Sequence, residues 1–166
     1  RLCDYINRES QQTDKLGLRY KTLIPCNLYG RHDKFAPQHS HLIPAIIHKI
    51  HQAKVHQLAE VDIWGDGTAR REFMYAGDLA GAVLKAVQEF DTVPDLMNIG
   101  LGHYFSSNEY YATAAQVIGW NGRFVQDITK PFGMKQKVVD ITCQRAWRLM
   151  PCAPLIVGIE NAIQYY

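Results

Sequence analysis

The side chains best suited to ligand chemistry fall in three short stretches of the first half of the chain. His41 and Lys49 are eight positions apart, a little over two helical turns, so both can face one groove. At a helix start the dipole disfavours an imidazolium, which favours a neutral or proton-donating role for His41. Because the chain has seven histidines, a surface or capping role is the competing interpretation.

Trp64 and Arg71 flank a Gly-Asp-Gly turn at residues 65–67. An indole ring stacks on a base or sugar, and a guanidinium group pairs bidentately with phosphate. The combination favours a nucleotide ligand. A β-hairpin whose Trp64 packs on the core, with Glu72 paired to an arginine, is the equally simple alternative.

Two further groups of polar residues have weaker functional signals. The Asn27 amide can donate and accept toward an amide or a sugar, and Gly30 permits a turn after it. An Asx turn is the alternative for Asn27. His48 and His51 have the i, i+3 spacing of metal ligands, but no carboxylate or cysteine completes the set, so we expect no metal.

Composition excludes several classes of partner. The net charge is +2 and the basic residues are scattered, which argues against nucleic acid. No apolar stretch is long enough to span a membrane, and no signal-peptide pattern opens the chain. The four cysteines have no metal-like spacing, so we expect free thiols and a cytoplasmic location.

Hydrophobic periodicity predicts an α/β to α+β fold with short elements. The predicted helices are residues 1–13, 39 or 40 to about 50, a segment from 78, 106–118 and 154–166. The predicted strands are residues 18–24, 61–64, 71–75, 96–99, 123–126 and 136–140. Residues 25–38 are predicted as the loop between strand and helix, which is the usual ligand position in an α/β sheet.

Local signals fix some helix starts and faces. Asp78 is the expected N-cap of its helix, and Ser106 with Glu109 forms a predicted capping box. The inner face of the Asp78 helix is predicted to be Leu79, Ala82, Val83, Ala86 and Val87. A turn is expected at residues 130–133.

Taken together, the motifs resemble nucleotide-sugar epimerase/dehydratases of the extended short-chain dehydrogenase/reductase type. The resemblance rests on Asn27-Leu28-Tyr29-Gly30, Ser40-His41-x-Ile43-Pro44-Ala45, Trp64-Gly65-x-Gly67-Thr68, Arg71-Glu72-Phe73, Asp78-Leu79-Ala80 and Asn98-Ile99-Gly100. It covers nearly all of the chain and is most specific to the GDP-L-fucose synthase branch. Members of that branch convert GDP-4-keto-6-deoxy-mannose to GDP-fucose with NADP.

The resemblance implies a role for particular residues. His41 is implied as the catalytic acid that reprotonates the sugar, beside the cofactor. The other residues implied to line NADP are Pro25, Cys26, Asn27 and Leu28. The residues implied to hold the GDP-sugar are Lys49, Trp64 and Arg71, with Arg71 on the diphosphate.

The resemblance also implies an architecture. Residues 1–38 correspond to the end of a Rossmann-like domain, and residues 39–166 mainly to the substrate-binding domain. The helix at residues 1–13 is implied to lie near a homodimer interface. Phe132 stands where relatives have an acidic residue, so the sequence leaves the GDP-sugar open.

Two motifs of the complete family are absent from this chain. It contains neither a Tyr-x-x-x-Lys pair nor a glycine-rich cofactor motif. We therefore expect the C-terminal part of a longer enzyme, inactive alone and lacking most of the NADP site. The competing hypotheses are a stand-alone, non-catalytic nucleotide-sugar-binding module and a related epimerase/dehydratase with another nucleotide-sugar.

Overall fold

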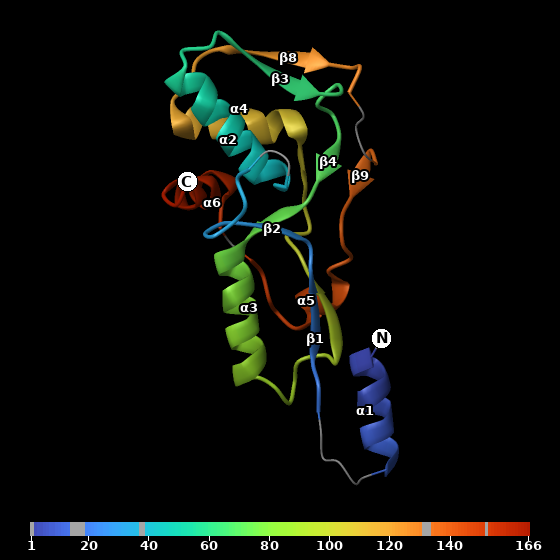
Figure 1. Cartoon of the computed structure of the whole chain (residues 1–166). Helices are drawn as coiled ribbons and strands as arrows, with labels where there is room; N and C mark the ends of the chain where they lie inside the picture. The colour runs from blue at the N-terminus through green and yellow to red at the C-terminus, as the bar shows by residue number, and fades with distance from the viewer. Residues whose placement is uncertain (1, 14–18, 37–38, 131–133, 152) are drawn as a thin grey trace.

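The computed structural model describes residues 2–13, 19–36, 39–130, 134–151 and 153–166 as an elongated mixed α/β molecule (Figure 1). The helices are α1 (Leu2–Thr13), α2 (Leu42–Val55), α3 (Ala76–Gln88), α4 (Ser107–Ile118), α5 (Thr142–Ala146) and α6 (Leu155–Ile163). The strands are β1 (Thr22–Pro25), β2 (Asn27–Tyr29), β3 (Glu60–Trp64), β4 (Arg70–Arg71), β5 (Phe73–Tyr75), β6 (Leu96–Ile99), β7 (Phe105–Ser106), β8 (Arg123–Asp127) and β9 (Gln136–Lys137). α1 lies at one end of the molecule, and the β3–β8 pair lies at the other (Figure 1).

Most strand pairs join segments that are distant in the sequence. β1 pairs with β6, β2 with β5 and β3 with β8, all in parallel. β4 lies between antiparallel β7 and parallel β9. Parallel pairing needs a crossover connection, which the helices supply. In the β2–β5 pair, Asn27 is in register with Phe73, so the segment after β1 is tied to the Arg-Glu-Phe motif.

Two hydrophobic clusters support these elements. The larger cluster packs α2, α4 and α6 beneath β3 and includes Ile47, Ile63, Tyr110 and Ile159. The smaller cluster gathers around α3 and β6. The candidate ligand-binding elements α2 and β3 therefore share one core, which fixes their relative positions. The predicted division of the chain at residue 38 stays a prediction.

The α/β fold class and several elements are confirmed. Helical periodicity predicts an apolar stripe of Leu42, Ile43, Ile46, Ile47 and Ile50 on α2; the four isoleucines are buried, and Leu42 is partly buried. The capping box at the start of α4 forms as predicted, and α4 ends at Gly119 in the left-handed conformation with φ 71°. Among the described residues, none of the helices has both the length and the apolar character needed to cross a bilayer.

Other sequence predictions were wrong. The predicted loop at residues 25–38 contains β2, whose pairing partner lies in a distant segment. Tyr75, not Asp78, is the N-cap of α3, because Asp78 lies in the first turn and accepts a 3.2 Å hydrogen bond from the Ala153 N–H. Val83 and Val87 are 45% and 66% exposed on α3 rather than buried.

Some expectations concern residues outside the described ranges. The predicted turn at residues 130–133 falls mostly there, and so do Phe132 and Cys152. The sequence did not predict α5, which has only five residues and is too short for a periodicity signal.

Candidate functional site

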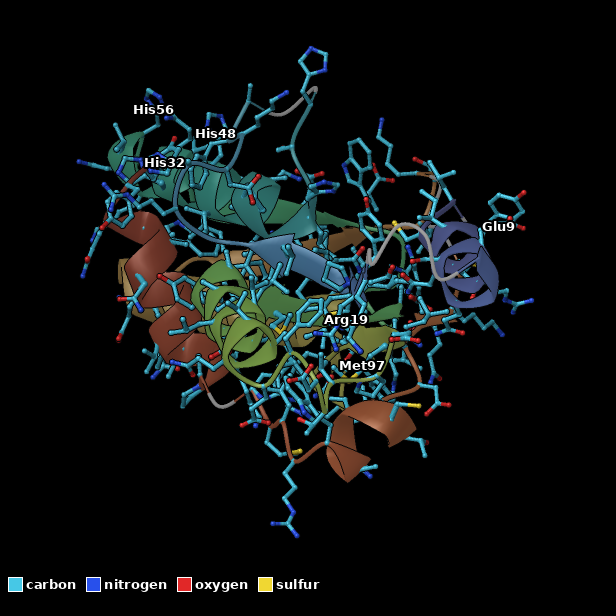
Figure 2. All side chains as sticks on the ribbon, turned by 90° about the horizontal axis from the view of Figure 1, so that it is seen from below. Glu9, Arg19, His32, His48, His56 and Met97 are labelled. Atoms are coloured by element: carbon cyan, nitrogen blue, oxygen red, sulfur yellow. The ribbon has the colours of Figure 1, made fainter. Side chains whose placement is uncertain are left out.

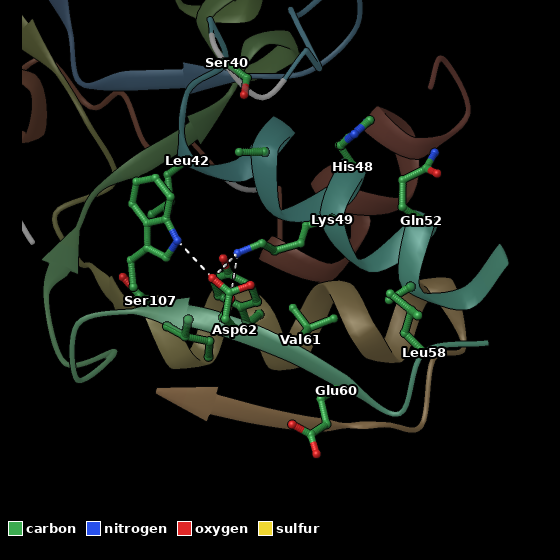
Figure 3. Close-up of a pocket in the computed structure, with 15 residues that line it drawn as sticks. Ser40, Leu42, His48, Lys49, Gln52, Leu58, Glu60, Val61, Asp62 and Ser107 are labelled. Atoms are coloured by element: carbon green, nitrogen blue, oxygen red, sulfur yellow. Dashed lines mark hydrogen bonds and ion pairs between the residues drawn. The ribbon is translucent and has the colours of Figure 1, made fainter. Parts of the chain in front are cut away.

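A cavity of about 630 Å³ lies between α2 and β3 (Figure 3). Its walls are largely apolar, with Leu42 and Ala45 from α2 and Val61 and Ile63 from β3. Tyr111 contributes from α4. A concave, mainly apolar site of this size with a few polar groups matches the usual form of a small-molecule site.

Lys49, Asp62 and Trp64 meet at one edge of this cavity. The Lys49 Nζ atom lies 2.9 Å from Asp62 Oδ2 and donates to the Asp62 backbone oxygen at 2.8 Å. The Trp64 indole N–H donates to the same Oδ2 atom at 2.9 Å. Figure 3 shows Lys49 reaching from α2 toward Asp62 on β3. The structure therefore brings the predicted ligand-binding residues Lys49 and Trp64 together.

The surroundings of Trp64 exclude the hairpin alternative. β3 pairs with β8 and not with β4, so the turn after Trp64 does not join two paired strands. Trp64 is 55% exposed rather than packed into the core. The ammonium groups of Lys49 and Lys130 each lie 5.9 Å from its ring centroid. An exposed indole flanked by two cations is a suitable surface for an anionic, ring-containing ligand.

Electrostatics keep Asp62 charged. Partial burial acts to raise the pKa of the Asp62 carboxyl, but the hydrogen bonds and the positive charge of Lys49 outweigh it. The Trp64 indole adds a further hydrogen bond, and the pKa lies below its ordinary value. Burial, followed by the negative charge of Asp62, raises the pKa of the Tyr111 phenol, which stays neutral. At the edge where Lys49 and Trp64 meet, the cavity thus carries the Asp62 carboxylate with its positive partner.

The structure places Arg71 apart from Lys49 and Trp64. Arg71 does not line the 630 Å³ cavity, and its Nη1 donates to the Arg70 backbone oxygen at 2.8 Å. Arg71 lies on β4, after the Gly65–Gly67 turn. The Tyr110 hydroxyl donates to the Arg71 backbone carbonyl at 2.9 Å and so fixes the backbone of β4. The neighbouring turn needs glycine, because Gly67 has φ 72°.

Glu72 is structural rather than paired with an arginine. Its side chain is buried, and its carboxylate accepts backbone N–H bonds from Leu101 at 2.6 Å, Gly102 at 3.1 Å and Val139 at 2.9 Å. The suggested arginine partner was wrong. Three N–H donors satisfy the buried carboxylate instead.

A second pocket, of about 420 Å³, brings together four of the residues predicted to contact NADP. Cys26, Asn27, Leu28 and His41 line it, whereas Pro25 ends β1 and is not part of the lining. His41 is the N-cap residue of α2, and its exposed side chain makes no capping hydrogen bond. The His41 imidazole therefore does not cap the helix and is available to contact a ligand.

The side chains of Asn27 and Cys26 have structural contacts in this pocket. The Asn27 amide donates to the Glu72 backbone oxygen at 2.9 Å, a long-range bond in place of the suggested Asx turn. Burial, with the charge of Glu72, raises the pKa of the Cys26 thiol to about 12. Cys26 is thus a partly buried, neutral thiol.

His48 and His51 contact Tyr166 at the end of the chain. His48 Nδ1 lies 2.8 Å from the Tyr166 hydroxyl, and the His51 ring centroid is 4.8 Å from that of Tyr166. His32, His48 and His56 gather on one side of the molecule, opposite Glu9 on α1 (Figure 2). Within the described ranges, no three His, Cys, Asp or Glu side chains are placed to hold a metal ion.

Comparison with known proteins identifies the family. Residues 2–100 match the family model described as "NAD dependent epimerase/dehydratase family". This chain belongs to that family. The sequence prediction of an epimerase/dehydratase is therefore confirmed.

Two curated relatives of this epimerase/dehydratase chain are GDP-sugar synthases. The GDP-L-fucose synthase of Azorhizobium caulinodans is 48% identical over 167 residues, which cover all of this chain and 51% of the relative. The GDP-L-colitose synthase of Yersinia pseudotuberculosis is 45% identical over 166 residues, covering all of this chain and 52% of the relative. The chain spans about half the length of the curated relatives it matches.

A solved structure confirms the Rossmann-type epimerase fold. The GDP-L-fucose synthetase from Naegleria fowleri, determined bound to NADP, superposes with a TM-score of 0.81 at 23% identity. The match covers 99% of this chain and 51% of the other.

The sequence analysis missed Asp62. The signal that could have found it is the period-2 alternation of β3, which buries Val61 and Ile63 and turns Asp62 and Trp64 to the other face. A carboxylate two positions before an exposed Trp, and opposite a helical Lys, is a candidate partner for both. The position of Lys49 relative to Asp62 depends on packing and could not be read from the sequence.

Proposed function

We propose that this chain forms the nucleotide-sugar-binding part of an NADP-dependent GDP-sugar epimerase/reductase. The observation that carries the proposal is the apolar cavity between α2 and β3, edged by Lys49 and the exposed Trp64. Its size suits a nucleoside, and both curated relatives act on GDP-linked sugars by their names. We infer that conversion of GDP-4-keto-6-deoxy-mannose to GDP-fucose is the reaction of the complete enzyme.

The proposed ligand positions follow from the side-chain chemistry. The Trp64 ring stacks on the nucleoside, and Lys49 hydrogen-bonds to a neighbouring oxygen. Arg71 takes the diphosphate after turning away from the Arg70 carbonyl, since a guanidinium pairs bidentately with phosphate oxygens.

The second pocket suits the nicotinamide end of NADP. It has room for part of a dinucleotide. Gly30 lines it with φ 152°, and a Cβ at this position would lie only 3.2 Å from the Tyr75 ring, so glycine keeps this wall of the pocket open. When bound in its reduced form, NADPH, the cofactor would supply the hydride. His41 faces the same pocket, so we infer that it supplies the proton to the sugar carbon.

The proposal extends to the whole protein. Residues 1–38 close the cofactor domain, and residues 39–166 form most of the substrate-binding domain. Exposed Leu2 and Tyr5 on α1 favour a homodimer through that helix. The described cysteines Cys3, Cys26 and Cys143 are all free, which favours a cytoplasmic location.

Calorimetric titration of the chain with GDP and UDP tests the binding role. We expect micromolar binding of GDP, weaker binding of UDP, and a loss of about tenfold or more in Trp64→Ala and Lys49→Ala, since stacking and charged hydrogen bonds contribute about 1–3 kcal/mol each. Arg8→Ala, which removes an exposed arginine on α1, is the matched control and should bind normally. Absence of GDP binding, or equal binding by Trp64→Ala, would refute the proposed function.

A chimera separates the enzyme from a stand-alone binding module. The chain alone lacks the Tyr-x-x-x-Lys pair, so we expect no NADPH-dependent turnover of GDP-4-keto-6-deoxy-mannose by it. Fusion to the N-terminal half of the Azorhizobium relative should restore turnover, and His41→Ala in the chimera should lower it. A folded chimera that binds NADPH and GDP but shows no turnover would favour the binding module.

A further inference from the structure

One carboxylate organises the edge of the cavity between α2 and β3. Asp62 accepts three hydrogen bonds from two side chains that come from different elements. The Lys49 ammonium, from α2, lies 2.9 Å from the carboxylate Oδ2 and also donates to the Asp62 backbone oxygen at 2.8 Å. The Trp64 indole, from β3, donates to the same Oδ2 at 2.9 Å. Asp62 itself faces the cavity.

These bonds restrict side chains that are otherwise free to move. Lys49 has four rotatable bonds and a side chain that is 32% exposed, and Trp64 is 55% exposed. Fixing each such side chain at the moment of binding costs rotamer entropy, which lowers the affinity. Two of the three Lys49 N–H donors already point to Asp62, which leaves one donor in a defined direction.

We propose that Asp62 is a positioning residue of the nucleotide-sugar site, which holds Lys49 and Trp64 in their binding orientations before the ligand arrives. This inference rests on the proposed function. Asp62 acts through Lys49 and Trp64, so its contribution falls when either partner is removed.

If charge alone decided affinity, removal of Asp62 would have the opposite effect on ligand binding. Asp62 is negative and lies beside the site proposed for an anionic ligand, so its removal should strengthen binding by relieving repulsion. Positioning predicts that its removal weakens binding. At about 0.15 M salt the repulsion between partly exposed charges is screened, whereas the cost of ordering two side chains is not. The sign of the effect therefore distinguishes the two explanations.

The first measurement uses the ligand-free chain. In proton–nitrogen NMR spectra, the Trp64 indole N–H should exchange slowly with water and its signal should move when Asp62 is protonated at low pH. In Asp62→Ala the exchange of the Trp64 indole N–H should accelerate at least severalfold. Asp62→Asn keeps an acceptor oxygen, so its exchange rate should lie between those of the wild type and Asp62→Ala. Trp120 and Trp147 are buried and serve as internal references.

The second measurement is GDP affinity in 0.15 M salt. We expect Asp62→Ala to weaken GDP binding about tenfold, from the cost of ordering two side chains. Asp62→Asn should weaken it less. In a Lys49→Ala background, Asp62→Ala should have a smaller effect, because one of its two partners is already gone. Asp127→Asn is the control, since it removes a neighbouring carboxylate charge on β8 whose side-chain hydrogen bonds go to Thr129 rather than to Lys49 or Trp64.

The outcomes distinguish the two levels of the proposal. If the wild-type chain does not bind GDP, the proposed function fails, and the inference fails with it. If the wild type binds GDP and Asp62→Ala binds equally or more tightly, the positioning role is wrong while the proposed function stands. Full additivity of the Asp62 and Lys49 substitutions would also contradict the positioning role. Unfolding curves should show that Asp62→Asn is folded, so that a loss of affinity in it cannot come from misfolding.

Discussion

The Glu72 carboxylate accepts a 2.9 Å hydrogen bond from the backbone N–H of Val139, 67 positions later in the chain. Its other oxygen accepts bonds from Leu101 and Gly102. A residue of the Arg-Glu-Phe motif thus joins β4 and β5 to the turn after β6 and to the segment after β9. The motif that carries Arg71 is held in place by this buried acid.

Glu72→Gln should destabilise the fold strongly. The amide nitrogen of glutamine would face backbone N–H groups and leave at least one buried donor unpaired, which costs about 1–3 kcal/mol in addition to the lost charged hydrogen bonds. We expect the free energy of unfolding in urea to fall by about 2–4 kcal/mol. Glu160→Gln, on the exposed face of α6, should change it by no more than about 0.5 kcal/mol. Equal effects of the two substitutions would refute the structural role of Glu72.

The capping box of α4 should make stability depend on pH. Hydrogen bonds from the Ser106 backbone and hydroxyl hold the pKa of Glu109 below its ordinary value. A carboxyl whose pKa is lower in the folded state stabilises the fold above its unfolded pKa, and this contribution is lost as the pH falls through the folded pKa. We expect the free energy of unfolding to decline below about pH 4.3, the ordinary glutamate value.

Ser106→Ala provides the test of that dependence. It removes the hydroxyl cap and should cost about 1 kcal/mol near neutral pH. The difference from wild type should shrink as the pH falls and Glu109 becomes protonated in both proteins. Urea unfolding at a series of pH values measures this, and a constant difference between pH 7 and pH 3 would contradict the role of Glu109 in the box.

The described cysteines should differ sharply in reactivity. Burial and the charge of Glu72 raise the pKa of the Cys26 thiol to about 12, so almost no thiolate is present at pH 8. Cys143 is exposed on α5. With iodoacetamide at pH 8, followed by mass spectrometry of peptides, we expect Cys143 to be modified at least tenfold faster than Cys26. The difference should vanish in denaturant, and equal rates in the folded chain would contradict the environment described for Cys26.

Local sequence signals predicted part of the fold and only some of the site. The stripe on α2 and the capping box of α4 were predictable because each depends on residues within a few turns. β2 was missed because its strand character comes from pairing with β5, a distant partner. Asp78 carries a capping side chain, but tertiary contact with Ala153 uses it instead.

The parts of the site that local sequence signals did not predict also depend on contacts between distant segments. Lys49 and Trp64 were predicted by residue type, and the structure brings them to one cavity. Their connection through Asp62 depends on the distance between α2 and β3, which the shared core sets. The separation of Arg71 from that cavity is likewise a tertiary feature, and its role on the diphosphate stays a prediction.

Mapping GDP onto the chain by NMR tests the binding cavity most directly. Amide signals of the isotope-labelled 166-residue chain would be followed as GDP is added, with the Trp64 indole signal as a side-chain reporter. We expect the largest shifts in α2 around Lys49, in β3 from Glu60 to Trp64, and in the Trp64 indole, with α1 unaffected. Saturating shifts confined to another part of the molecule, or no shifts at millimolar GDP, would contradict the assignment of this cavity as the nucleotide site.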